Sequence, residues 1–261
     1  MNGSEIIAYL SILYHGDWTK IMDALHQKKR IDPDEAMRTL SRCKSSFVTL
    51  LDDEYPSALR EMARPPICLF YRGRLSLISD YAKCVSMVGS RDASPYGLSA
   101  ASYLARSAAE GGYAVVSGLA TGIDTAVAEG CIDFGKHVAV LGNGLDYYYP
   151  RDNRDLQRRL AGGCGLVISE YPDEAEPTQK TFPARNRIIA GLSKGTLLVE
   201  AKKHSGSMIT AAFALEFNRE LAAVPYRTED ESVCNQIIKE GGTMIETKED
   251  LLFWLDSKNI I

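Results

Sequence analysis

The sequence has few of the residues that build metal centres, disulfide frameworks or membrane spans. Its six cysteines are scattered without a CxxC pair, and only four histidines are spread over 261 residues. This distribution argues against a zinc site or a disulfide scaffold and is typical of proteins whose cysteines are reduced thiols. No apolar run approaches the roughly 20 residues of a membrane span, and no secretory signal is visible at the N-terminus. We therefore expect a cytoplasmic protein that uses no metal, cofactor or membrane.

Several catalytic motifs are missing as well. The P-loop pattern GxxxxGK[ST] is absent, which argues against nucleotide hydrolysis by that mechanism. The serines of the segment 205–207, SGS, have no His–Asp set that the sequence can assign to them, so a serine hydrolase is disfavoured. The segment 142–147, GNGLDY, begins like a dinucleotide-binding GxGxxG but ends in tyrosine, which opposes close helix–strand contact. Glu170 could imitate a ribose-binding acid, so a NAD site stays open as the weaker interpretation.

Three segments are expected from the hydrophobic pattern. Residues 1–45 read as short helices and form a small helical (SAM-like) module, and residues 46–83 read as a connector that packs on the core and carries two strands, at 47–51 and 67–71. From residue 84 to 261, buried-strand runs alternate with helical runs. The expected strands are 84–88, 114–116, 137–141, 166–169, 196–200, 221–224 and 243–245, and the expected helices are 96–110, 122–134, 153–161, 184–192, 207–218, 235–240 and 248–255. This alternation predicts an α/β fold with a doubly wound, mostly parallel sheet.

A basic segment stands out against the acidic whole. From Lys180 to Lys203 there are six Lys or Arg residues and one acid, which gives a net charge of +5 inside a chain of net charge −4. A local field of this kind suits a polyanion. A structural alternative remains, in which Arg185 and Arg187 pair internally with Glu170 and Glu200 and the lysines are simply solvated.

Glycine and hydroxyl residues follow four of the expected strands, at 88–91 (VGSR), 117–122 (SGLATG), 141–144 (LGNG) and 204–207 (HSGS). Ligands of such sheets bind beyond the carboxyl ends of the strands, where glycine admits a ligand and helix N-termini favour phosphate. Asp124, Glu170 and Glu200 lie near these turns. A catalytic carboxylate pair is conceivable, but helix capping or arginine pairing explains them better.

These motifs resemble the bacterial DNA-processing protein A family, DprA/Smf, over about residues 46–246. The matching segments, in chain order, are VGSR at 88–91 with Ser94 and Tyr96-Gly97, SGLAxGID at 117–124, LGxGLDxxYPxxN at 141–153, SEYP at 169–172 with FPxRNRIIAGLS at 182–193, and EAxxxSGSxITA at 200–211. The resemblance implies an extended Rossmann-like fold and single-stranded DNA binding without an established catalytic activity. It further implies protection of incoming strands in natural transformation, loading of the RecA recombinase, and a homodimer.

The motifs and the resemblance together give a set of candidate DNA-binding residues. They are Gly89, Ser90, Arg91, Ser117, Gly118, Arg151, Phe182, Arg185, Asn186, Arg187, Lys202, Ser205, Gly206 and Ser207. Phe182 is included because an aromatic ring can stack on a base, although core packing is an equal alternative. The resemblance implies self-association near the C-terminus, where Ile237 and Ile238 are adjacent and one of them could face a second copy.

The sequence also departs from the family pattern. Ala128 stands where the family often has histidine, Tyr226 replaces a glycine after proline, and the glycine-rich segment that follows reads SVCN at 232–235. The chain ends at Ile261, so we expect no winged-helix-like C-terminal domain. The rival interpretation is a nucleotide-binding or nucleotide-hydrolysing enzyme of the related phosphoribohydrolase type. That class uses PGGxGTxxE, whereas residues 205–212 lack both the double glycine and the acid. A nucleotide sensor without catalysis is a third possibility.

Overall fold

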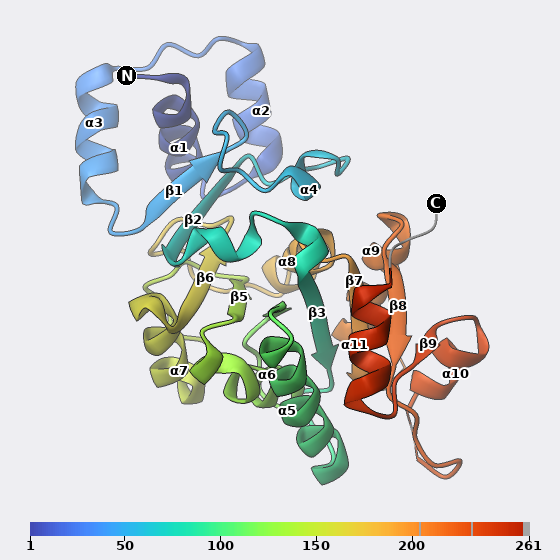
Figure 1. Cartoon of the computed structure of the whole chain (residues 1–261). Coiled ribbons are helices and arrows are strands. Elements are labelled where there is room, and N and C mark those ends of the chain that lie inside the picture. Colours follow the sequence, from blue (N-terminus) through green and yellow to red (C-terminus); the bar gives the residue numbers. More distant parts are fainter. Residues whose placement is uncertain (204, 231, 258–261) are drawn as a thin grey trace.

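The computed structural model describes residues 1–203, 205–230 and 232–257 and places all of its strands in one nine-stranded sheet (Figure 1). The order across the sheet is β1-β2-β6-β5-β4-β3-β7-β8-β9. The strands are β1 (Ser46–Thr49), β2 (Cys68–Gly73), β3 (Cys84–Gly89), β4 (Ala114–Ser117), β5 (His137–Leu141), β6 (Gly165–Ser169), β7 (Gly195–Glu200), β8 (Glu220–Ala223) and β9 (Thr243–Met244). Each strand expected from the sequence is present, with ends that differ from the expected ones by at most two residues.

The sheet has a reversal of strand order at its centre. From β3, the strands β4, β5 and β6 are added one after another toward one edge of the sheet. Strand β7 pairs with the other side of β3, and β8 and β9 are added toward the opposite edge. All of these pairs are parallel. The expectation of a doubly wound, mostly parallel sheet is therefore confirmed, and the reversal between β3 and β7 is the position where ligands bind in such folds.

The segment 46–83 belongs to the sheet itself. Strand β2 pairs antiparallel with β6, and β1 pairs antiparallel with β2, so this segment forms one edge of the sheet. The N-terminal helices α1 (Gly3–Leu13), α2 (Trp18–His26) and α3 (Pro33–Arg42) share a buried cluster with that edge, in which Leu10 and Ile21 pack with Phe70 and Val167. Helices and edge strands therefore have one hydrophobic core in common.

Helices cover both faces of the central strands. Side chains alternate along a strand, so Met87 joins the cluster of one face and Val88 joins that of the other. The first face carries α5 (Pro95–Glu110), α6 (Ile123–Cys131) and α11 (Lys248–Asp256); the second carries α4 (Ser57–Arg60), α8 (Thr181–Gly191), α9 (Gly206–Glu216) and α10 (Cys234–Lys239). Helix α7 (Arg154–Arg159) is preceded by a short turn, η4 (Arg151–Asn153), and lies before β6 in the chain. Within the described residues, no helix combines the length and apolar character that a membrane crossing requires.

His137, at the start of β5, is completely buried. Its Nε2 lies 3.4 Å from Ser117 Oγ, and its Nδ1 lies 3.5 Å from Cys131 Sγ. Burial lowers the pKa of this imidazole from 6.5 to about 3, because the charged form loses its hydration. The folded protein thus holds His137 neutral at pH values where the unfolded chain protonates it.

We predict that this histidine contributes to acid sensitivity. Between about pH 6.5 and 3 the unfolded state binds one proton more than the folded state, so stability falls as the pH falls, by up to about 1.4 kcal/mol per pH unit. His137→Gln should remove that part of the slope. The measurement is urea unfolding of both proteins at several pH values; equal slopes would contradict a buried neutral imidazole.

Candidate nucleic-acid interface

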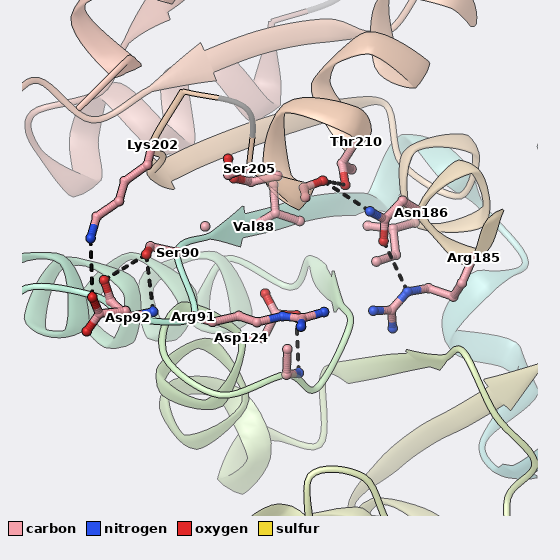
Figure 2. Close-up of a pocket in the computed structure, with 15 residues that line it drawn as sticks. Val88, Ser90, Arg91, Asp92, Asp124, Arg185, Asn186, Lys202, Ser205 and Thr210 are labelled. Atoms are coloured by element: carbon pink, nitrogen blue, oxygen red, sulfur yellow. Dashed lines mark hydrogen bonds and ion pairs between the residues drawn. The ribbon is translucent and has the colours of Figure 1, made fainter. Parts of the chain in front are cut away.

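A crevice of about 400 Å³ lies at the carboxyl ends of β3 and β7, where the strand order reverses. Figure 2 shows side chains from the loops after these strands and from α8 around one hollow. Nine of the candidate DNA-binding residues line it: Gly89, Ser90, Arg91, Arg185, Asn186, Lys202, Ser205, Gly206 and Ser207. His204, the first member of the expected fourth turn, lies outside the described residues.

The turn after β3 is held close to the end of β7. The backbone N–H of Ser90 donates to the carbonyl of Glu200 at 2.7 Å, and the Ser90 hydroxyl donates to the carbonyl of Asp92 at 2.7 Å. A Cβ at Gly89 would lie 2.5 Å from Ile123 Cγ1 and 2.7 Å from the Glu200 carbonyl, so a side chain does not fit there. Arg91, next in the chain, is exposed and extends along the crevice.

Arg185 is buried and makes its hydrogen bonds to the protein. Its guanidinium donates to the carbonyl of Gly118 at 2.8 Å and also to the carbonyl of Val140, and its Nε donates to Asn186 Oδ1 at 3.2 Å. Burial lowers the pKa of Arg185 to about 10, with Asp124 acting in the opposite direction. Arg185 thus forms the floor of the crevice and joins α8 to the ends of β4 and β5.

Ser117 and Gly118 support this floor and do not line the crevice. Ser117 is fully buried. The backbone N–H groups of Gly118 and Ala120 donate to Asp124 Oδ2 at 3.0 and 3.3 Å, and a Cβ at Gly118 would lie 2.4 Å from the Arg185 guanidinium. Burial raises the pKa of Asp124, while Arg185 and these N–H groups lower it. Asp124 therefore stabilises the turn after β4 by accepting these hydrogen bonds. This is the structural role that the sequence favoured over a catalytic one.

The far wall of the crevice is the N-terminus of α9. Asn186 Nδ2 donates to the carbonyl of Gly206 at 3.1 Å, and the hydroxyls of Ser205 and Ser207 lie 2.7 Å apart. Ser205 is the N-cap residue but makes no side-chain bond to the helix backbone. The first N–H groups of an α-helix carry partial positive charge and attract anions. This wall therefore offers a phosphate-sized anion both N–H and hydroxyl donors.

Lys202 closes the crevice on the side of the β7 loop. Its Nζ lies 3.2 Å from Asp92 Oδ2, in a pair whose side chains are 51% and 97% exposed. Exposed pairs of this kind contribute about 0–1 kcal/mol. A ligand phosphate can therefore replace the carboxylate of Asp92 at little cost.

Arg187 lies apart from the crevice. Its guanidinium pairs with Glu170 Oε1 at 2.6 Å, and the two side chains are only 13% and 8% exposed. It also donates to the carbonyls of Arg64 and Ala184. The internal pairing considered for Arg187 is therefore present, whereas Glu200 accepts from the Ser94 backbone and hydroxyl and from the Tyr226 hydroxyl. A DNA contact of Arg187 stays a prediction.

Phe182 and Arg151 lie beyond the crevice. The Phe182 ring is 5.2 Å from the ring of Tyr149, and the Arg91 guanidinium lies 5.5 Å from the Phe182 centroid. Arg151 is exposed on η4. Tyr149, 45% exposed, was missed in the sequence. The YYYP run could have indicated it, because exposed aromatics beside arginines are typical of single-strand binding surfaces.

Two departures from the family pattern have a local explanation. The Tyr226 hydroxyl donates to Glu200 Oε2 at 2.9 Å, and its ring packs edge-on against Tyr96 with 5.1 Å between centroids. Ala128 is fully buried on α6, in the apolar cluster of Leu119 and Ile132, an environment that suits a small apolar side chain. Among the described residues, no cluster of three His, Cys, Asp or Glu could hold a metal ion.

The fold is that of a Rossmann-like α/β protein, and the crevice at the switch point of its sheet is lined by groups suited to an anion. Residues 46–256 match the sequence model of the family described as DNA recombination-mediator protein A. The chain belongs to this family.

Several relatives share most of the chain. DNA processing protein DprA of Streptococcus pneumoniae is 38% identical over 232 residues, which cover 88% of this chain and 81% of that protein. Protein Smf of Synechocystis is 36% identical over 231 residues, and the chain spans only 58% of its length. The crystal structure of the pneumococcal protein superposes with a TM-score of 0.80 over 92% of this chain and 83% of the other, at 36% identity. A DprA structure from Helicobacter pylori, determined to explain its single-stranded DNA binding mode, has a TM-score of 0.73 at 28% identity and covers 81% of this chain and 96% of its own.

The pairing of Arg187 predicts a structural phenotype. Arg187→Ala leaves the Glu170 carboxylate buried without its partner, which typically costs about 3–5 kcal/mol. Lys202→Ala, which breaks an exposed pair, is the control and should change stability by less than about 1 kcal/mol. Chemical denaturation of both variants measures this; equal losses would contradict the assignment of Arg187 to the framework.

Proposed function

We propose that this protein binds single-stranded DNA through the switch-point crevice. The observation that carries the proposal is the convergence of Arg91, Lys202 and the α9 N-terminus on one hollow. Each supplies donors or positive charge suited to a phosphate. The described pairings leave the Arg91 guanidinium without a carboxylate, so it is available to an incoming phosphate. The ssDNA-binding mode studied for the H. pylori relative supports this choice of ligand.

We propose binding without catalysis. Two carboxylates close to the crevice are engaged in the framework: Asp124 accepts backbone N–H groups, and Glu200 accepts from Ser94 and Tyr226. The third, Asp92, lies at the solvent edge and pairs with Lys202. A phosphoribohydrolase needs an acid that is free to act on its substrate. The NAD interpretation is also disfavoured, because Glu170, its candidate ribose acid, is paired with Arg187.

Membership of a recombination-mediator family supports a finer proposal. We infer that the protein covers incoming single strands and assists loading of RecA in transformation or recombination, acting in the cytoplasm as a homodimer. The family description and the pneumococcal relative support the pathway.

The substrate proposal predicts binding without ATP or a metal ion. In gel shifts, an oligothymidylate should bind more tightly than duplex DNA or mononucleotides. Affinity should fall with salt, with a log–log slope of about −0.7 for each phosphate neutralised. Arg91→Glu should weaken binding at least tenfold, because it places a negative charge where a phosphate lies, yet leave the melting temperature within a few degrees, because the side chain is exposed.

The control for this variant is Arg106→Glu, which makes the same charge change at an exposed position on α5. It should bind DNA like the wild type. If Arg91→Glu binds equally well, the crevice is not the DNA site. If the wild type prefers mononucleotides or requires ATP, the rival nucleotide-binding function is correct.

The dimer proposal concerns α10. Ile237 is buried in the core at 8% exposure, whereas Ile238 is only partly buried at its margin. Ile238→Asp should therefore give a folded monomer, and Ile237→Asp should destabilise the fold. Light scattering and circular dichroism of both variants test this. A wild type that is monomeric at high concentration contradicts the proposal.

A further inference from the structure

A second surface with arginine and aromatic side chains lies on the turn and helix that follow β5. Tyr148 is partly buried, and two arginines of α7 lie on its ring: the Arg154 guanidinium is 5.2 Å and that of Arg158 is 5.4 Å from the ring centroid. Arg158 Nε also lies 3.5 Å from the Tyr148 hydroxyl. Tyr148, Arg154 and Arg158 are called the α7 platform below.

The arginines of the platform are exposed and have no acidic partner. Within the described part of the chain, neither Arg154 nor Arg158 has a carboxylate within 4.0 Å, whereas Arg159, the next residue of the same helix, pairs with Asp133 at 2.9 Å. Asp152 and Asp155 also lie on this surface, but residues 151–159 still hold four arginines against these two acids. The platform therefore keeps a positive field and unused guanidinium donors.

Contacts between aromatic rings and a guanidinium group connect the platform to the crevice. Arg91 lines the crevice and lies 5.5 Å from the Phe182 ring, which lies 5.2 Å from the ring of Tyr149. Tyr149 follows Tyr148 directly. Basic and aromatic groups thus continue from the crevice to α7, in the combination that non-specific single-strand binding uses: cations for phosphates and rings for bases.

Tyr148 is not needed for the described core. It belongs to none of the three buried apolar clusters and is not among the partly buried residues packed against them. A purely structural ring would be expected in one of those clusters. Its contacts are instead with two exposed guanidinium groups, which can move aside or sandwich an incoming base.

We infer that the α7 platform is a second subsite for single-stranded nucleic acid. It holds a base against Tyr148 and the flanking phosphates on Arg154 and Arg158, and the strand passes over Phe182 and Tyr149 from the crevice. The inference rests on the proposed function of the crevice. It adds that the site extends beyond the crevice and that longer strands gain affinity from α7.

The test compares two oligothymidylates, one of about 6 nucleotides and one of about 16, which bracket the site sizes usual for single-strand binding folds. In the Arg154→Ala/Arg158→Ala double variant, the longer strand should bind about tenfold more weakly than to the wild type. Its salt slope should fall by about 1.4, since two phosphates are released. The double variant should bind the short strand as tightly as the wild type does, because this strand fits within the crevice.

Matched variants distinguish the loss of the α7 platform from a general loss of positive charge. Arg159→Ala removes the same charge from the same helix, but from an arginine already paired, and should have a smaller effect than Arg158→Ala. Tyr148→Leu should weaken the longer strand only, and Tyr148→Phe, which keeps the ring, should restore binding. A 5-iodouracil-substituted 16-mer should crosslink to Tyr148.

The outcomes distinguish the two levels of the proposal. If the wild type binds both strands but the double variant and Tyr148→Leu bind the longer strand like the wild type, the platform is refuted and the crevice stands. Equal losses for both strands also refute a separate subsite. If the wild type binds neither strand, the proposed function fails and the platform fails with it.

Discussion

The buried guanidinium of Arg185 is the interaction on which the candidate site depends. It satisfies the carbonyls of Gly118 and Val140 at the ends of two parallel strands, and an unpaired buried carbonyl would cost about 1–3 kcal/mol. The adjacent Asn186 holds the first carbonyl of α9. One dipeptide of α8 therefore fixes both the floor of the crevice and the helix end that forms its wall.

This arrangement separates a buried framework from exposed groups. Arg185 and Arg187 are engaged by the protein, whereas Arg91 and Lys202 carry positive charge at the solvent edge. Preorganised donors bind an anion without a further ordering cost. The acidic total charge of the chain does not oppose this, because the field at the crevice comes from the nearby cations.

The sequence predicted the β/α order because apolar runs and glycine turns are local signals. It also indicated that the turns after β3 and β7 would meet, since parallel strands end at one edge. It could not decide which arginine is buried, because the distinction between Arg91 and Arg185 depends on side-chain direction in the folded core. The edge position of residues 46–83 was equally hidden, because strand pairing is set by tertiary contacts. The stacking on Tyr148 was missed for the same reason, although Arg154 and Arg158 are four residues apart on one helix face.

The most direct test of the account is hydrogen–deuterium exchange of the protein with and without a saturating oligothymidylate. If single-stranded DNA lies in the crevice, amides in peptides covering 89–92 and 205–210 should become protected, because the backbone N–H groups at the start of α9 face the phosphates. Peptides of α11 should be unchanged. Protection confined to α11 or to the N-terminal helices, with no change at the start of α9, would contradict the assignment of the crevice as the DNA site.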